Sequence, residues 1–342
     1  MSLIASAIRA AERTPLPDSL ARMGIDFLVG RTKRKLAAQS DRQDDDFARA
    51  MAAYPVATFT EAANAQHYEL PPEFFALTLG PARKYSCCLY PEGRETLDEA
   101  ERLALEETIA HADLTDGHSI LELGCGWGSL TLFMAERYPR STITAVSNAK
   151  PQRLYIEAQA RARGLDNIRV VTADMNAFTP DRVYDRVVSV EMFEHMSNWR
   201  VLLARIKTWL VPEQGRLFIH VFSHRHSPYR FDHRNDADWI AQHFFTGGIM
   251  PSHGLIRHFP DCFTLEKDWR WSGLHYQKTA LDWLARFDAE RSQIDQILNE
   301  VYGSDAALWR QRWRLFYLAT AGLFGHADGE EWGVSHYLMR PT

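Results

Sequence analysis

The sequence predicts an α/β protein, a doubly wound parallel sheet with helices before it and a helical cap inserted after the fifth strand. From His118 onward, short apolar runs alternate with longer helical stretches, which is typical of βαβ units. The first run leads into a glycine-rich turn, the place where doubly wound folds bind ligands. After Phe222 the alternation stops and a segment rich in His and aromatic residues follows.

Length and charge narrow the class of protein. The 342 residues, 46% of them hydrophobic, can bury a core in one large domain or two smaller ones. The 39 basic and 44 acidic residues give a net charge of -5, so no overall field attracts nucleic acid or anionic lipid. We therefore expect neither a nucleic-acid partner nor a stable membrane association.

Cysteine usage predicts the compartment. The four cysteines are too few and too scattered for a disulfide scaffold, and they form no C-x-x-C zinc motif. No apolar run reaches the roughly 18 residues of a membrane-spanning helix, and no signal peptide is recognisable. We expect a cytoplasmic protein.

Residues 1–70 are predicted to form a helical segment. Leu20, Met23 and Phe27 supply the apolar positions of an amphipathic stretch, which continues into a basic cluster at 31–35. An acidic run follows at 44–46. Because it follows so closely, a solvated helix face is favoured for the basic cluster over a membrane contact.

Residues 71–225 are predicted to form the core of the sheet, and residues 226–342 a substrate cap that includes the last strands. The strands of the core are expected at 119–123, 142–146, 168–172, 186–190 and 216–222. Its helices are expected at 129–138, 151–163 and 199–210. In the cap we expect a strand at 263–271, two helices, and a final strand at 335–339.

The first strand ends in a turn with Gly124, Gly126 and Gly128. Glycines let the backbone approach a ligand closely. A turn that serves packing alone is disfavoured, because three glycines in five positions cost chain entropy without a packing return.

Two ligands compete for this turn, a dinucleotide and S-adenosylmethionine. A dinucleotide site favours G-x-G-x-x-G and an acidic residue at the end of the second strand. Here the spacing is G-x-G-x-G, the second strand ends in Ser147 and Asn148, and an acidic residue, Glu122, precedes the glycines. At the end of the third strand, Asp174 is placed to accept from the adenine amino group and Met175 to cover the ring, although a lone Asp there is as often a helix cap.

The segment after the fourth strand carries Glu191, Glu194 and His195 at the edge of the sheet where a transferable group would lie. Histidine readily moves a proton near neutral pH, and a neighbouring carboxylate can orient it or hold its charge. We interpret these residues as an acid/base group. The alternative is a capping carboxylate and a solvent-facing histidine.

The histidines at 220, 224, 226 and 233 suggest a metal site, but their spacing is poor and no H-E-x-x-H motif accompanies them. We expect no metal. His220 is interpreted as a pocket residue and the other three as parts of a solvated loop.

Seven motifs make the sequence recognisable: KYSCCLYPEG (84–93), LELGCGWGSL (121–130), SNAKPQ (147–152), VEMFEHM (190–196), FFTGGIMPS (244–252), SGLHY (272–276) and LFGHADGEEW (323–332). They resemble those of the cyclopropane-fatty-acid-synthase-like methyltransferases, and within that family the coclaurine N-methyltransferase branch. The resemblance implies a class I, Rossmann-like methyltransferase fold with its last strand inserted antiparallel next to the sheet edge. It also implies S-adenosylmethionine as methyl donor and S-adenosylhomocysteine as product.

The resemblance further implies roles for single residues. Tyr85 and Ser86 would hold the methionine part of the cofactor above the three glycines, and Asn148 and Gln152 would replace the usual acidic ribose ligand. Glu194 and His195 match the catalytic pair of the family. Residues at the acceptor site would be Cys87, His220, Tyr276, Phe324 and Trp332.

The acceptor has two interpretations. Relatives that modify lipids bind bicarbonate as a base near these residues, and most of that constellation is present here. The amino-terminal segment is shorter than their lipid-binding region, however, and GEEW resembles the amine enzymes. We expect a small amine, aromatic or alkaloid-like, as substrate; the alternative is cyclopropane formation on unsaturated lipid with bicarbonate. The sequence leaves a homodimer open.

Overall fold

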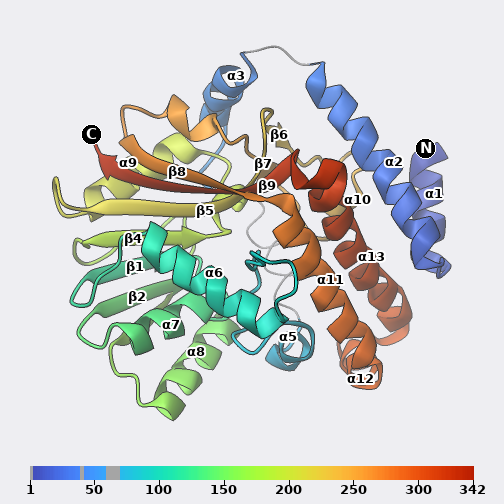
Figure 1. Cartoon of the computed structure of the whole chain (residues 1–342), viewed down its shortest axis with the longest axis horizontal. Helices are drawn as coiled ribbons and strands as arrows, with labels where there is room; N and C mark the ends of the chain where they lie inside the picture. The colour runs from blue at the N-terminus through green and yellow to red at the C-terminus, as the bar shows by residue number, and fades with distance from the viewer. Residues whose placement is uncertain (1–2, 39–41, 59–69) are drawn as a thin grey trace.

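The computed structural model describes residues 3–38, 42–58 and 70–342, and it is built around a seven-stranded sheet (Figure 1). The strand order is β3-β2-β1-β4-β5-β9-β8. The strands are β1 (Ser119–Leu123), β2 (Thr142–Ser147), β3 (Ile168–Thr172), β4 (Arg186–Val190), β5 (Arg216–His224), β8 (Phe263–Ser272) and β9 (Trp332–Pro341). β1 to β5 are parallel, and β9 lies antiparallel between β5 and β8. The predicted fold class, with the antiparallel insertion of the last strand, is confirmed.

Helices cover both faces of the sheet. On one face lie α6 (Leu97–His111), α7 (Ser129–Arg137) and α8 (Lys150–Arg163), and on the other α3 (Gln43–Ala50) and α9 (Trp199–Trp209) (Figure 1). Consecutive residues of β1 show why: Ile120 packs toward α6 and α7, whereas Leu121 packs toward α9. A strand buried on both faces reads as a continuous apolar run, which is the pattern of the sequence here.

The cap stands at the carboxyl ends of the parallel strands. Its long helices are α11 (Gly273–Ala289), α12 (Arg291–Tyr302) and α13 (Ala306–Gly325), and the amino-terminal helices α1 (Leu3–Arg13) and α2 (Asp18–Ala37) pack against α13. Its shorter elements are α10 (Trp239–His243), β6 (Tyr229–Arg230), β7 (Ile249–Met250) and the 3-10 turns η3 (Leu255–His258), η4 (Gly303–Asp305) and η5 (His326–Gly329). Two further short elements, the 3-10 turn η1 (Met51–Ala53) and the helix α5 (Pro72–Thr78), precede α6 in the chain. Three helices follow β8, not the two expected, because Gly303 at φ 53° ends α12 before α13 begins. None of the helices in the described residues is long and apolar enough to cross a membrane.

The helical segment before the core differs from its predicted pattern. Leu20, Met23 and Phe27 of α2 are 52%, 69% and 59% exposed, so the predicted apolar positions are not the buried ones. α2 instead packs closely on α13, where a Cβ at Gly322 would come within 2.4 Å of Ile25. Close helix packing on a glycine explains why the interface does not follow the large apolar side chains.

Candidate active site

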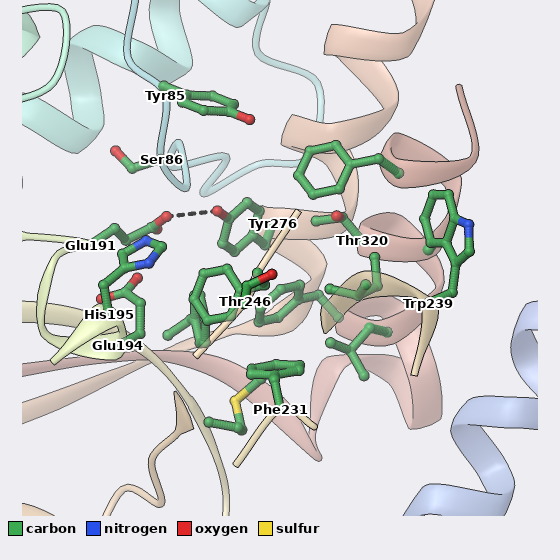
Figure 2. Close-up of a pocket in the computed structure, with 18 of the residues that line it drawn as sticks. Tyr85, Ser86, Glu191, Glu194, His195, Phe231, Trp239, Thr246, Tyr276 and Thr320 are labelled. Carbon is green, nitrogen blue, oxygen red and sulfur yellow. Dashed lines mark hydrogen bonds between the residues drawn. The ribbon is translucent and has the colours of Figure 1, made fainter. Parts of the chain in front are cut away.

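A cavity of about 950 Å³ opens at the carboxyl ends of the parallel strands and runs from the turn after β1 to the helices of the cap. Figure 2 shows some of the side chains that line it. The cavity joins the expected cofactor residues to two of the five expected acceptor residues. The predicted residues on its wall are Tyr85, Ser86, Glu122, Gly124, Gly126, Asn148, Gln152, Asp174, Met175, Glu191, Glu194, His195, Tyr276 and Phe324.

The three glycines of the turn have different roles. All have positive φ, at 79°, 51° and 81° for Gly124, Gly126 and Gly128. A Cβ at Gly124 would lie 2.7 Å from Met192, and one at Gly128 would lie 2.6 Å from Ile156. The expectation of no packing return is therefore wrong for these two. Around Gly126 nothing lies within 4 Å of such a Cβ, and this glycine keeps the cavity wall open.

Glu122 on β1 is a buried carboxyl on the cavity wall. It is 2% exposed, and its one hydrogen bond comes from the hydroxyl of Thr131 in α7. Burial raises its pKa to about 8. A cationic ligand beside it would restore its charge, which fits S-adenosylmethionine, with its ammonium and sulfonium groups, better than a dinucleotide.

The ends of β2 and β3 supply further candidate cofactor contacts. Gln152 is buried, and its Oε1 accepts a hydrogen bond of 2.6 Å from Ser147 Oγ. Asn148 is exposed to the opening. Asp174 Oδ1 accepts from the Asn176 amide at 2.7 Å, so this side chain caps a turn and also reaches the wall.

A loop before α6 closes the cofactor side and holds a lysine that the sequence analysis missed. Lys84 is 1% exposed, and its Nζ donates to Ser86 Oγ and to the carbonyl oxygen of Cys87, both at 2.6 Å. The Lys84 amide donates to Glu101, a carboxyl buried in α6. No sequence pattern distinguishes a buried lysine from a solvated one, and its three interactions fix the position of Ser86.

Glu191 follows β4 with φ 47°, accepts hydrogen bonds from a tyrosine and a backbone amide, and lies next to a histidine. Tyr276 of α11 donates its hydroxyl at 2.6 Å, the Cys87 amide donates at 2.9 Å, and His220 Nε2 lies 3.2 Å away. Burial raises the pKa of Glu191, while Lys84, the Cys87 amide and the Tyr276 hydroxyl act against that rise. Donors on both oxygens favour the ionised form of Glu191.

Glu194 and His195 lie in the 3-10 turn η2 (Phe193–His195), on the same side of the cavity as Glu191 (Figure 2). Glu194 is 1% exposed, and its Oε2 has no hydrogen-bond partner. Burial raises its pKa well above the ordinary value, and the charge of Glu191 raises it further. The His195 ring packs at 4.5 Å against Phe245 of the cap. The turn thus places an imidazole and a buried carboxyl together at the cavity wall.

The expected acceptor residues divide into two groups. Tyr276 and Phe324 are on the wall and stack at 4.4 Å. Cys87 and His220 lie behind it: the Cys87 thiol contacts the Cys88 carbonyl oxygen, and His220 lies behind Glu191. Trp332, which is fully buried, donates to the Tyr229 hydroxyl from outside the cavity. Gly128 is also absent from the wall.

Two further side chains on the cap wall escaped the sequence analysis. Trp239 of α10 donates its indole N–H to the buried Glu12 of α1 at 2.7 Å. Phe245, which belongs to the FFTGGIMPS motif, packs on His195. This motif is the only sequence signal that could have pointed to Phe245 or Trp239.

One of the remaining histidines was misplaced. His224 belongs to β5 and is 3% exposed, where its Nδ1 accepts from the Ser227 amide at 2.8 Å. The expectation of a solvated loop is therefore wrong for His224, because β5 continues two residues beyond its predicted end. In the described residues, no cluster of three or more His, Cys, Asp and Glu is arranged to hold a metal ion.

The fold and this site can be compared with known proteins. The model of the family "Mycolic acid cyclopropane synthetase" matches residues 57–326. The chain belongs to this family. The (S)-coclaurine N-methyltransferase of Thalictrum flavum subsp. glaucum is 37% identical over 290 residues, which cover 83% of this chain and 80% of that enzyme. The cyclopropane-fatty-acyl-phospholipid synthase of Escherichia coli K12 is 29% identical over 272 residues, 79% of this chain and 66% of that enzyme.

Solved structures agree with the fold. A coclaurine N-methyltransferase bound to N-methylheliamine and S-adenosylhomocysteine superimposes with a TM-score of 0.95 at 32% identity, covering 99% of this chain and 100% of that chain. A cyclopropane synthase of Mycobacterium tuberculosis has a TM-score of 0.69 at 23% identity, covering 84% and 99%. The expected enzyme class and cofactor are confirmed: the chain is an S-adenosylmethionine-dependent methyltransferase.

Proposed function

We propose that this enzyme N-methylates a small amine, aromatic or alkaloid-like, with the Glu194/His195 pair as base. The observation that carries the proposal is the position of Glu194 and His195 on the wall of a cavity that also reaches the glycine turn. An amine must lose an ammonium proton before it attacks the methyl group, whereas a lipid alkene has no such proton to remove.

The cofactor end of the cavity provides the residues to hold S-adenosylmethionine. We assign Glu122 to its cationic part, Tyr85 and Ser86 to the methionine part, and Gln152, Asn148 and the Asp174–Met175 segment to the adenosine. The bound cofactor supplies an electrophilic methyl group on a sulfonium.

The residues of the acceptor end prepare the amine. His195 removes the ammonium proton, which frees the nitrogen lone pair, and Glu194 stabilises the resulting imidazolium. The rings of Tyr276, Phe324 and Phe245 offer aromatic faces to a cationic ring system. Most other aromatic residues of the cap lie outside the cavity wall; Trp313, for example, is a fully buried core residue.

The relatives support both an amine and a lipid as acceptor, since their names include N-methyltransferases and cyclopropane synthases. The higher identity and TM-score of the amine enzymes favour the amine. Cytoplasmic location and a homodimer stay predictions from the sequence.

A methyl-transfer assay with radiolabelled cofactor tests the proposal. Secondary and tertiary amines of the tetrahydroisoquinoline type are compared with vesicles of unsaturated phospholipid, each with and without added bicarbonate. We expect amine-dependent transfer that bicarbonate does not change. Transfer to phospholipid that collapses when bicarbonate is removed, with no amine methylated, would overturn it in favour of lipid modification.

A further inference from the structure

Behind Glu191, three histidines form a continuous line of hydrogen bonds from the cavity to the protein surface. His220 Nε2 lies 3.2 Å from Glu191 Oε1, and His220 Nδ1 lies 2.8 Å from His336 Nε2. His336 Nδ1 lies 2.8 Å from His111 Nδ1. His111 Nε2 lies 3.0 Å from Oε1 of Glu107, whose side chain is 43% exposed. The line joins a carboxylate on the cavity wall to one in contact with solvent.

The sheet register assembles this line from distant parts of the chain. His220 of β5 and His336 of β9 are direct cross-strand partners, and Trp269 of β8 is the next residue in the same row. Cross-strand partners project from the same face of a sheet. α6 covers that face, and its last residue is His111, with Glu107 one turn earlier.

Aromatic rings enclose the line. His220 and His336 are fully buried, and both ring nitrogens of each take part in the line. Trp269 stacks on the His111 ring at 3.7 Å, and Trp271 packs 4.4 Å from the His336 ring. A proton on this line therefore has no side exit to water before His111.

The charges around the line favour passage of a proton over its storage. Burial lowers the pKa of His220 and His336 well below the ordinary value, and Lys84 lowers both further. Burial also lowers the pKa of His111, with Lys267 of β8 acting in the same direction and Glu107 against it. At the inner end, Glu191 is faced by Lys84, Cys87, Tyr276 and Glu194.

We propose that His220, His336 and His111 form a proton exit path that carries the proton of the methyl acceptor from Glu191 to Glu107 and solvent. This inference rests on the proposed N-methylation of an amine. One N–H bond of the substrate ammonium breaks, and its proton, removed by His195, reaches Glu191, which lies on the same side of the cavity (Figure 2).

The transfer balances in protons. Protonated Glu191 donates to His220 Nε2, the Nδ1 proton of His220 passes to His336 Nε2, and the Nδ1 proton of His336 passes to His111 Nδ1. His111 is then an imidazolium next to the Glu107 carboxylate, Glu191 is ionised again, and the number of protons on the line is unchanged. The Nε2 proton of His111 leaves to solvent, and the imidazoles reorient before the next turnover. His336 and His111 are positioning residues that act through Glu191.

The test compares full-length wild type with His111→Phe across pH. Phenylalanine keeps a ring against Trp269 and removes both nitrogens. His118→Ala is the control, because His118 is a half-buried histidine outside the line whose ring nitrogens bond to Thr115 in its own turn. With a secondary amine near pH 7, we expect kcat/KM of His111→Phe to fall on the order of tenfold or more. Above the pKa of the amine itself, the loss should shrink to about twofold or less, because the substrate then arrives deprotonated.

A merely structural role predicts a different result, namely the same fold-loss at every pH. That result, or an unchanged kcat/KM near pH 7, would overturn the exit path. If His111→Phe does not fold, His111→Ala with added imidazole carries the test: rescue that grows with imidazole concentration supports the path, and absence of rescue contradicts it. If the wild-type enzyme methylates no amine, the proposed function itself is contradicted. The assay of the wild type alone gives this result, so failure of the proposed function can be distinguished from failure of the exit path.

Discussion

The two ends of the cavity are built in different ways. At the cofactor end, the backbone sets the shape: Gly124, Gly126 and Gly128 turn at positive φ where β1 ends. At the acceptor end, side chains of separate helices set the shape, with Tyr276 from α11 and Phe324 from α13 in contact across 48 residues of sequence. A substitution in the glycine turn should affect binding of the whole cofactor. Substitutions at the acceptor end should affect the acceptor alone.

The difference extends to electrostatics. Glu122 at the cofactor end has a single neutral donor, Thr131, and burial raises its pKa to about 8. Glu191 at the acceptor end accepts from the Cys87 amide and the Tyr276 hydroxyl. The charge of Glu122 is therefore stabilised only when a ligand binds. The charge of Glu191 is stabilised by hydrogen bonds before any ligand binds.

The largest effect is expected for Gly126→Val, which should abolish cofactor binding. At φ 51° a β-branched side chain is strained, and its Cβ would enter the open space at the turn. Calorimetry should detect no binding of S-adenosylmethionine. Gly93→Val is the matched control, because Gly93 also has positive φ, 73°, with nothing within 4 Å of a Cβ. If both variants lose binding equally, strain and not blockage of the cavity is the cause.

The cofactor end was predictable from the sequence because its geometry is local. Strands β1, β3 and β4 begin and end at the predicted residues, since each is an apolar run bounded by turns and polar residues. The glycine turn and the edge position of Glu191 and Glu194 follow directly from those strand ends. The ligand-facing status of Gly126, as opposed to Gly128, needed the structure, because it depends on the distant Ile156.

The acceptor end was predictable only in outline. Its walls depend on how helices dock, and the docking of α2 uses Ile25 and Gly322 where the sequence pattern favoured larger apolar positions. His336 and His111 were missed altogether. They are 225 residues apart, and only the register of β9 and the position of α6 bring them together.

His195→Ala should separate the two ends next most strongly. We expect turnover of the amine to fall about a hundredfold to ten-thousandfold, the usual range for loss of a general base. Binding of S-adenosylmethionine should be unchanged, because the ring faces Phe245 of the cap. Single-turnover kinetics and calorimetry measure the two quantities, with the exposed His226→Ala as control. Unchanged turnover in His195→Ala would remove this residue from the base.

Cofactor binding should depend on pH through Glu122. Because the pKa of Glu122 is about 8 in the free protein, binding of a cation next to it releases a proton below that pH. Affinity for S-adenosylmethionine should rise by up to about tenfold per pH unit toward pH 8 and then level off.

The stability of the free protein should depend on pH in the opposite direction. The folded state keeps a proton on Glu122 that the unfolded chain loses near the ordinary pKa of 4.5. This group therefore reduces the free energy of unfolding as the pH rises from 4.5 toward 8. Glu122→Gln should flatten both slopes in calorimetry and in thermal unfolding, and slopes that persist in the variant would assign them to another group.

The smallest effect, and the one that best isolates the acceptor end, is expected for Phe324→Leu. Phe324 stacks on Tyr276 at 4.4 Å with an interplanar angle of 21° and faces the cavity, so its loss removes one aromatic face from a bound cationic ring. An exposed or partly exposed cation–π contact contributes about 0.5–1 kcal/mol, so KM for the amine should rise roughly twofold to fivefold. The affinity for S-adenosylmethionine should not change, because Phe324 lies at the acceptor end of the cavity.

Phe287→Leu is the matched control: Phe287 is 2% exposed in the same helical core, packs on Tyr317 and lies outside the cavity wall. Both variants should lower the unfolding temperature by similar amounts, and only Phe324→Leu should raise KM for the amine. A rise in KM shared by both would mean that the helices of the cap hold the acceptor through their packing as a whole, and the separation of the two ends would then apply to the cofactor end alone.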